Sequence, residues 1–307
     1  MARSDEVTVR APAKINLELR VGVPRADGFH ELATVFHAVS LFDDVTATER
    51  EEGITVTVEG MQADLVPLDG SNLAVRAARL LAERTGIEAG VHLHVHKGIP
   101  VAGGMAGGSA DAAATLVACD ILWRCGLSRD ELVTLAGELG SDVPFALLGG
   151  TAIGTGRGER LTPALARGDY HWVLAVADHG LSTPAVYAEA DRLRAERVLP
   201  EPRVSDQLMQ ALRAGDPAAL GRVLVNDLQP AACSLAPTLR RTLTVGRQAG
   251  ALGGLVSGSG PTVAFLARDT EHALDVAVAL SASGVCRDVR RAHGPVPGAR
   301  VVEPVHG

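Results

Sequence analysis

The chain of 307 residues carries a formal net charge of −7, and 47% of its residues are hydrophobic. No basic excess exists to neutralise phosphates, which argues against a nucleic-acid-binding protein and against electrostatic docking on acidic lipid. No apolar run approaches the roughly 20 residues that span a bilayer, and the first residues lack the apolar core of a signal peptide. Because its four cysteines form no C-x-x-C pair, we expect the chain in the reducing cytoplasm.

The first predicted element is a strand over residues 7–21, where apolar and polar residues alternate. This period predicts one buried face and an interruption near Pro12. Lys14 and Asn16 fall on the other face, so we expect them to point away from the core. Further strands are predicted over residues 54–58, 91–96, 172–177 and 262–267.

Helices are predicted where apolar residues recur between capping signals. Ser128 and Glu131 form a capping box, and the helix that follows runs to Leu139 and delivers the chain to residues 140–144. Asp216 before Pro217 marks the start of another helix. Two more are predicted over residues 72–85 and 271–283, each followed by a glycine.

Glycines and prolines crowd residues 150–170, which predicts a boundary between two domains. We place an N-terminal domain at residues 1–165 and a C-terminal domain at residues 166–307.

The strongest motif is a loop with glycines at positions 103, 104, 107 and 108, followed by a helix of small residues that runs from Ser109 toward Trp123. Glycine lets a backbone approach a ligand closely, and the unpaired amides of the helix start favour an anion. The loop is neither a Walker A loop, because no Gly-Lys-Ser/Thr closes it, nor a dinucleotide fingerprint, because its spacing is Gly-Gly-x-x-Gly-Gly. A phosphate site and a tightly packed glycine turn both remain open. Ser109 would cap the helix or bind a phosphate-bound metal.

Two residues outside the loop are candidates for catalysis. A carboxylate at Asp142 can accept a proton from a hydroxyl, and an ammonium at Lys14 can stabilise that carboxylate and a transferring phosphoryl group. The alternatives are a capping carboxylate and a solvated lysine. Only two of the 29 basic residues are lysines, and we interpret the other one, Lys97, as a surface residue. His92, His94 and His96 alternate along one strand and are interpreted as a solvated face rather than a metal site.

A turn at residues 25–30 carries Phe29 and His30. Either Phe29 packs into the core, or the two residues form a platform that stacks on a base and hydrogen-bonds to it. A second glycine loop covers residues 257–262, where a tight turn is the alternative to a ligand contact.

Three segments in this order, residues 11–17, 100–112 and 255–262, resemble the three motifs of the GHMP kinases. The resemblance implies an α+β fold of two domains. The N-terminal domain would hold an ATP-binding core with a left-handed crossover, the C-terminal domain would be a ferredoxin-like α/β sandwich, and the active site would lie between them. Within the family, the turn at residues 25–30 and the segment at 140–144 resemble kinases of the non-mevalonate isoprenoid pathway, whose small-molecule substrate carries a cytidine diphosphate group.

The resemblance also implies roles for individual residues. Asp142 matches the catalytic base and Lys14 its partner. The ATP loop comprises Pro100, Val101, Ala102, Gly103, Gly104, Met105, Ala106, Gly107, Gly108, Ser109, Ala110 and Asp111. The expected substrate-binding residues are Asn16, the stacking rings Phe29 and Tyr187, the cytosine-reading His30, Thr183, and Gly258, Ser259 and Gly260 of the third motif.

The expected cofactors are ATP and Mg²⁺. No carboxylate pair marks a metal site in the sequence, so the ion would be held by phosphate oxygens, water and Ser109. Met105 and Ala106 replace the usual leucine and glycine without removing a backbone amide, and Phe29 replaces a frequent tyrosine without losing the ring. A homoserine- or mevalonate-type kinase and an inactive nucleotide-binding regulator are the alternatives.

Overall fold

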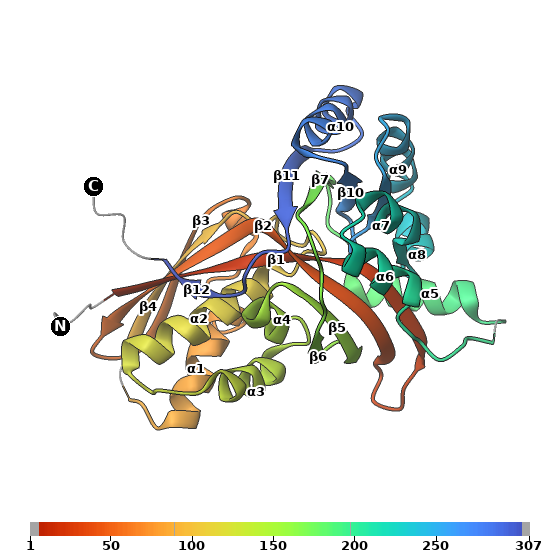
Figure 1. Ribbon diagram of the computed structural model, residues 1–307. Coiled ribbons are helices and arrows are strands. Elements are labelled where there is room, and N and C mark those ends of the chain that lie inside the picture. Colours follow the sequence, from red (N-terminus) through yellow and green to blue (C-terminus); the bar gives the residue numbers. More distant parts are fainter. Residues whose placement is uncertain (1–5, 89, 197, 303–307) are drawn as a thin grey trace.

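The computed structural model describes residues 6–88, 90–196 and 198–302. Within these residues the strands form two sheets, and helices cover both (Figure 1). The larger sheet has the order β12-β1-β2-β4-β3, with β5 and β6 continuing from β2 and with β8 paired to β1. Its strands are β1 (Glu6–Pro24), β2 (His30–Arg50), β3 (Ile54–Gly60), β4 (Gly90–Lys97), β5 (Thr151–Gly156), β6 (Arg160–Pro163), β8 (Val225–Asn226) and β12 (Arg300–Val301).

The helices of the first half pack against the larger sheet. They are the short η1 (Ala63–Leu65), α1 (Leu73–Thr85), α2 (Gly107–Trp123), α3 (Arg129–Leu139) and α4 (Val143–Leu148). Helix α2, with ten of its 17 residues buried, contacts α1, β1, β2 and α4, so it forms the centre of this half. The strands β3 and β4 run parallel and are joined through α1, and the handedness of this crossover stays a prediction.

The smaller sheet has the order β11-β7-β10-β9 and lies beside the first (Figure 1). In chain order its strands are β7, β9, β10 and β11, and helices follow the first and the third of these. This is the arrangement of the predicted ferredoxin-like sandwich. The strands are β7 (Tyr170–Val176), β9 (Gly253–Val256), β10 (Val263–Ala267) and β11 (Asp288–Gly294). The helices are α5 (Thr183–Arg194), α6 (Asp206–Ala214), α7 (Pro217–Val223), α8 (Gln229–Leu235), α9 (Thr238–Gln248) and α10 (Thr270–Ser283).

The two halves of the chain are joined through the larger sheet. The last strand of the first half, β6, ends at Pro163, and the smaller sheet begins at Tyr170, so the predicted boundary falls in this connection. However, β8 and β12 from the second half pair with β1 on the larger sheet. The division into domains at residue 165 therefore stays a prediction.

Two expectations for β1 were wrong. Pro12 does not interrupt the strand, because a register shift between Pro12 and Ala13 absorbs the irregularity. The polar face is not exposed either: Lys14, Asn16 and Glu18 are buried together with the apolar face. The second half of the chain covers that face, and Glu18 accepts hydrogen bonds there from the backbone and hydroxyl of Ser205.

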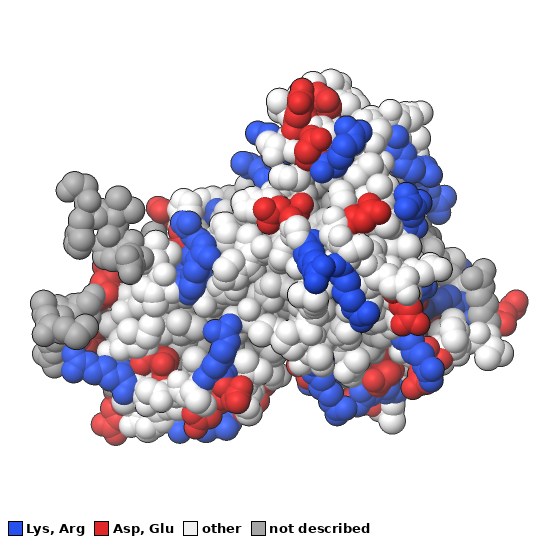
Figure 2. All heavy atoms as spheres, viewed as in Figure 1, with Lys and Arg blue, Asp and Glu red and all other residues white. Residues whose placement is uncertain are grey.

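Two of the predicted helix caps are confirmed. Ser128 and Glu131 form the predicted capping box, and the helix ends at Leu139. Asp216 caps α7 through two backbone amides. Acidic and basic side chains are interspersed over the face drawn in Figure 2, without a continuous basic patch. None of the described helices is long and apolar enough to cross a membrane.

Candidate active site

A cavity of about 730 Å³ is lined by residues from both halves of the chain. Most of the predicted site residues meet there. They are Lys14 and Asn16 of β1, Phe29 and His30, residues 102–104 and 106–109 of the glycine loop, Asp142, Thr183 and Tyr187 of α5, and Gly258 and Ser259 of the third motif.

The glycine loop connects β4 to α2, whose first residue is Gly107. No side chain caps this helix, so the backbone amides of its first turn have no side-chain acceptor. The residues of that turn line the cavity, where the amides can bind an anion. Ser109 lies inside the helix, and its predicted capping role was wrong. Gly104 has φ +73°, and a Cβ there would lie 2.5 Å from the carbonyl oxygen of Ser257, so only glycine fits where the two glycine loops touch.

The remaining residues of the predicted loop do not line the cavity. Met105, Ala110 and Asp111 are buried beneath the loop, and Pro100 and Val101 are its first two residues. The amide of Val101 donates to the side chain of Gln62, which holds the start of the loop in place.

Lys14 and Asp142 meet in the cavity, with 3.4 Å between the Lys14 Nζ and the nearer Asp142 carboxylate oxygen. The Lys14 ammonium also donates to Asn16 Oδ1 at 2.9 Å, and Asn16 donates to the hydroxyl of Thr34 at 2.8 Å. These bonds fix the direction of the ammonium. Gly258 packs onto the pair, since a Cβ there would lie 3.3 Å from the Lys14 Nζ.

The position of Asp142 answers the capping alternative. The residue stands at the N-cap of α4, yet its side chain makes no capping hydrogen bond. Its carboxylate is 32% exposed and lines the cavity. A carboxylate left free in this way, with an ammonium beside it, can accept a proton from a bound hydroxyl.

Phe29, His30 and Tyr187 form an aromatic cluster at the cavity. Phe29 is 50% exposed, which excludes the alternative that it packs into the core. His30 is buried, and its ring centroid lies 4.9 Å from that of Tyr187. Burial raises the pKa of the Tyr187 hydroxyl, which keeps it protonated. Exposed and half-buried rings around one cavity offer flat surfaces to a base.

Sequence reasoning missed two residues of this region. Asp191 accepts from His30 Nε2 at 2.9 Å, and Arg157 lies over the Phe29 ring at 4.9 Å. Asp191 follows Tyr187 by one helical turn on α5, a spacing that could have revealed it. Arg157 lies in no recognised motif and gave no signal.

The third motif is held close to α5. The hydroxyls of Thr183 and Ser259 are 2.8 Å apart, and Asn226 donates to the carbonyl oxygens of Val256 and Gly258 at 2.7 Å. Gly260 does not line the cavity and instead packs against Gly104.

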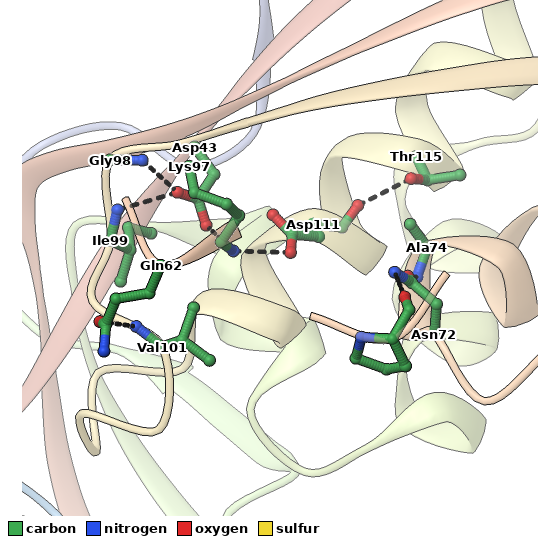
Figure 3. A network of polar contacts seen from close by, with 11 residues as sticks. Asp43, Gln62, Asn72, Ala74, Lys97, Gly98, Ile99, Val101, Asp111 and Thr115 are labelled. Atoms are coloured by element: carbon green, nitrogen blue, oxygen red, sulfur yellow. Dashed lines mark hydrogen bonds and ion pairs between the residues drawn. The ribbon is translucent and has the colours of Figure 1, made fainter. Parts of the chain in front are cut away.

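The prediction that Lys97 is a surface residue was wrong. Lys97 is 3% exposed and forms ion pairs with Asp43 and with Asp111, the latter at 2.6 Å (Figure 3). Asp43 also accepts from the amides of Gly98 and Ile99. This buried triad of Lys97, Asp43 and Asp111 therefore ties β2, the end of β4 and α2 together beneath the glycine loop.

The charges of the buried triad are unequal, with two carboxylates around one ammonium. Burial alone would lower the pKa of Lys97, but Asp111 and Asp43 outweigh it and raise the pKa. Burial and the adjacent Asp43 raise the pKa of Asp111 well above its usual value. Asp111 Oδ1 has no hydrogen-bond partner among the described residues.

The three histidines of β4 behave as predicted. His94 and His96 contact Glu59 at the surface, and His92 contacts Thr55. Within the described parts of the chain, no group of three or more histidine, cysteine, aspartate or glutamate side chains could hold a metal ion.

Comparison with known proteins decides the family. Residues 72–150 match the GHMP kinases N terminal domain, and residues 208–286 match the GHMP kinases C terminal domain. A 4-diphosphocytidyl-2-C-methyl-D-erythritol kinase of Streptomyces coelicolor is 59% identical over 297 residues, which cover 97% of this chain and 99% of that protein. The chain belongs to the GHMP kinase family.

Further comparisons support the same family. A kinase of the same name from Thermobifida fusca is 59% identical over 303 residues, covering 96% of this chain and 98% of that protein. A crystal structure of a 4-(cytidine 5'-diphospho)-2C-methyl-D-erythritol kinase is 34% identical, with a TM-score of 0.77 over 93% of this chain and 98% of that one. Homoserine kinase from Cytophaga hutchinsonii has the same TM-score, 0.77, at 20% identity over 98% and 99% of the two chains, which shows a shared fold only.

Proposed function

We propose that this chain transfers the γ-phosphoryl group of ATP to the 2-hydroxyl of 4-diphosphocytidyl-2-C-methyl-D-erythritol, a step of the non-mevalonate isoprenoid pathway. Full-length relatives of that name, at 59% identity, support the reaction. The observation that carries the proposal is the cavity itself. A carboxylate with an ammonium, a glycine loop at a helix start and a cluster of aromatic rings all line it.

In this proposal Asp142 is the general base. Its carboxylate accepts the proton of the substrate hydroxyl as the oxygen attacks the γ-phosphorus, and the bond from that phosphorus to the bridging oxygen breaks so that ADP leaves. Lys14, whose ammonium lies 3.4 Å from this carboxylate, pairs with it and offsets negative charge on the transferring phosphoryl group. Asn16 holds the ammonium in place through its 2.9 Å hydrogen bond and contacts the substrate from the same strand.

The glycine loop would hold the triphosphate through its backbone amides and the start of α2. A metal ion that arrives with ATP fits this cavity, because Ser109, in the first turn of α2, lines it with a hydroxyl-bearing side chain. Such an ion would be held by phosphate oxygens, water and Ser109, and it would neutralise phosphate charge. Asp111 is excluded as a ligand here, because its carboxylate is buried against Lys97.

The cytosine would stack between Phe29 and Tyr187 and hydrogen-bond to His30. Thr183, Gly258 and Ser259 would contact the rest of the substrate. We also propose that the enzyme acts in the cytoplasm, where its four cysteines, all free, stay reduced.

A panel assay of ADP release tests the proposal with three substrates: 4-diphosphocytidyl-2-C-methyl-D-erythritol, homoserine and mevalonate. We expect turnover with the cytidyl compound alone, because neither of the others has a base for the aromatic cluster. Turnover with homoserine or mevalonate would instead indicate a different kinase of this family. ATP binding without turnover on any of the three would indicate a regulator.

A further inference from the structure

Arg157 is a cation of the cavity that has no anionic partner in the described parts of the chain. Among the cavity-lining residues, Lys14 pairs with Asp142 and His30 with Asp191. In the described residues, the Arg157 guanidinium forms no ion pair and donates no hydrogen bond. Its contact is with the Phe29 ring, whose centroid lies 4.9 Å from the guanidinium carbon. An unpaired, half-buried guanidinium beside a ligand cavity is a candidate anion-binding group.

The turn that carries Arg157 is fixed by its backbone. Arg157 stands between Gly156 (φ +74°) and Gly158 (φ +103°), in the connection from β5 to β6. Its own amide donates to the Glu159 carboxylate at 2.7 Å, and the amide of Gly158 donates to the carbonyl oxygen of Thr155 at 3.0 Å. The side chain therefore starts from a defined position at the cavity.

The negative charge of a cytidyl substrate needs a cation in the cavity that no carboxylate already occupies. The two acidic side chains that line it, Asp142 and Asp191, already face Lys14 and His30. A cytidyl substrate brings a further anion, the diphosphate between its base and its reacting alcohol. Because the base would lie at Phe29 and the alcohol at Asp142, the diphosphate must lie in the same cavity.

We infer that Arg157 binds the diphosphate group of the cytidyl substrate, an inference that rests on the proposed function. The stacking on Phe29 supports it. A guanidinium that lies on a ring keeps the N–H donors of its plane free, and their fork matches two phosphate oxygens. Arg157 would thus select substrates in which a phosphorylated chain continues from the base.

Titration calorimetry with cytidine, cytidine monophosphate and cytidine diphosphate tests this inference on the full chain. For Arg157→Gln we expect about tenfold weaker binding of the diphosphate and cytidine binding within about twofold of the wild type. Arg157→Lys should recover part of the loss, since it keeps the charge but not the fork. Arg160→Gln is the matched control, because Arg160 lies on the same hairpin with a side chain that is 79% exposed.

The outcomes separate the possible roles of Arg157. Equal losses for cytidine and for the diphosphate would overturn the inference, because Arg157 would then act only through Phe29. Unchanged diphosphate binding in folded Arg157→Gln would overturn it as well. Steady-state kinetics should show a raised Michaelis constant for the cytidyl substrate, with that for ATP unchanged. A raised constant for ATP instead would place Arg157 at the triphosphate.

Failure of the proposed function is visible in the wild type alone. A wild-type chain that neither binds cytidine diphosphate nor phosphorylates the cytidyl substrate would refute the proposed function. Normal wild-type turnover with unaltered Arg157→Gln binding would refute only the role of Arg157.

Discussion

The chain has two lysines, and the structure gives them opposite surroundings. Lys14 lines a cavity beside one partly exposed carboxylate, whereas Lys97 is enclosed with two buried ones. Both lie close to a glycine: Gly258 sits on Lys14 and Gly107 on Lys97, each with a potential Cβ 3.3 Å from the ammonium. The comparison teaches that the number of carboxylates does not identify a catalytic lysine. Of the two, only Lys14 lines the cavity, and this is why the proposed catalytic role falls to Lys14.

The largest expected effect tests the cavity side of this comparison. Asp142→Asn and Lys14→Met should each lower the turnover number about 100-fold or more, because one removes the proposed base and the other the charge proposed to stabilise the transfer. Urea unfolding should change by less than about 1 kcal/mol for Asp142→Asn, since this carboxylate is partly exposed. Near-normal turnover of Asp142→Asn would refute its role as the base, and the ATP affinity of that variant should stay close to the wild-type value.

The next effect tests the buried side. Lys97→Met should lower the free energy of unfolding by about 3–5 kcal/mol, because it leaves two buried carboxylates without their cation. Urea unfolding followed by circular dichroism measures the loss. Asp111→Asn is the matched control: it removes one of two carboxylates that compete for one ammonium, so its loss should be much smaller. If Lys97→Met were as stable as the wild type, the buried triad would not tie the three elements together.

The smallest effect concerns neither lysine. Phe29→Ala and Tyr187→Ala should each raise the Michaelis constant for the cytidyl substrate about tenfold, the effect expected when one stacking surface is lost. The constant for ATP should hardly move, because the proposal places both rings on the cytosine and the triphosphate on the glycine loop. Initial-rate kinetics with each substrate varied in turn gives both constants. Equal increases for ATP and for the cytidyl substrate would contradict the stacking role.

Much of the fold was predictable because local signals decide it. The capping box at Ser128 and Glu131 and the proline start of α7 depend on neighbouring residues only, and both were read correctly. The polar face of β1 was misread, since alternation reports which residues are polar and not what covers them. The residues that cover the polar face of β1 lie near positions 205 and 225, far along the chain.

The site was predictable where motifs mark it. The glycine loop, Lys14 and Asp142 line one cavity as the resemblance implied. Lys97 was misread because its partners, Asp43 and Asp111, lie on different elements and follow no spacing rule. Arg157 was missed for the same reason, since only the fold brings its hairpin to Phe29.

The strands β8 and β12 have a consequence for how substrates reach the cavity. They attach the second half of the chain to β1 at Glu18 and Leu19 and again at Val9 and Arg10. A hinge needs an interface that can separate, whereas here strand pairing joins the two halves at two separate places along β1. We therefore expect substrates to enter and leave through movement of short segments that border the cavity, such as the turn before β2 and the hairpin that carries Arg157.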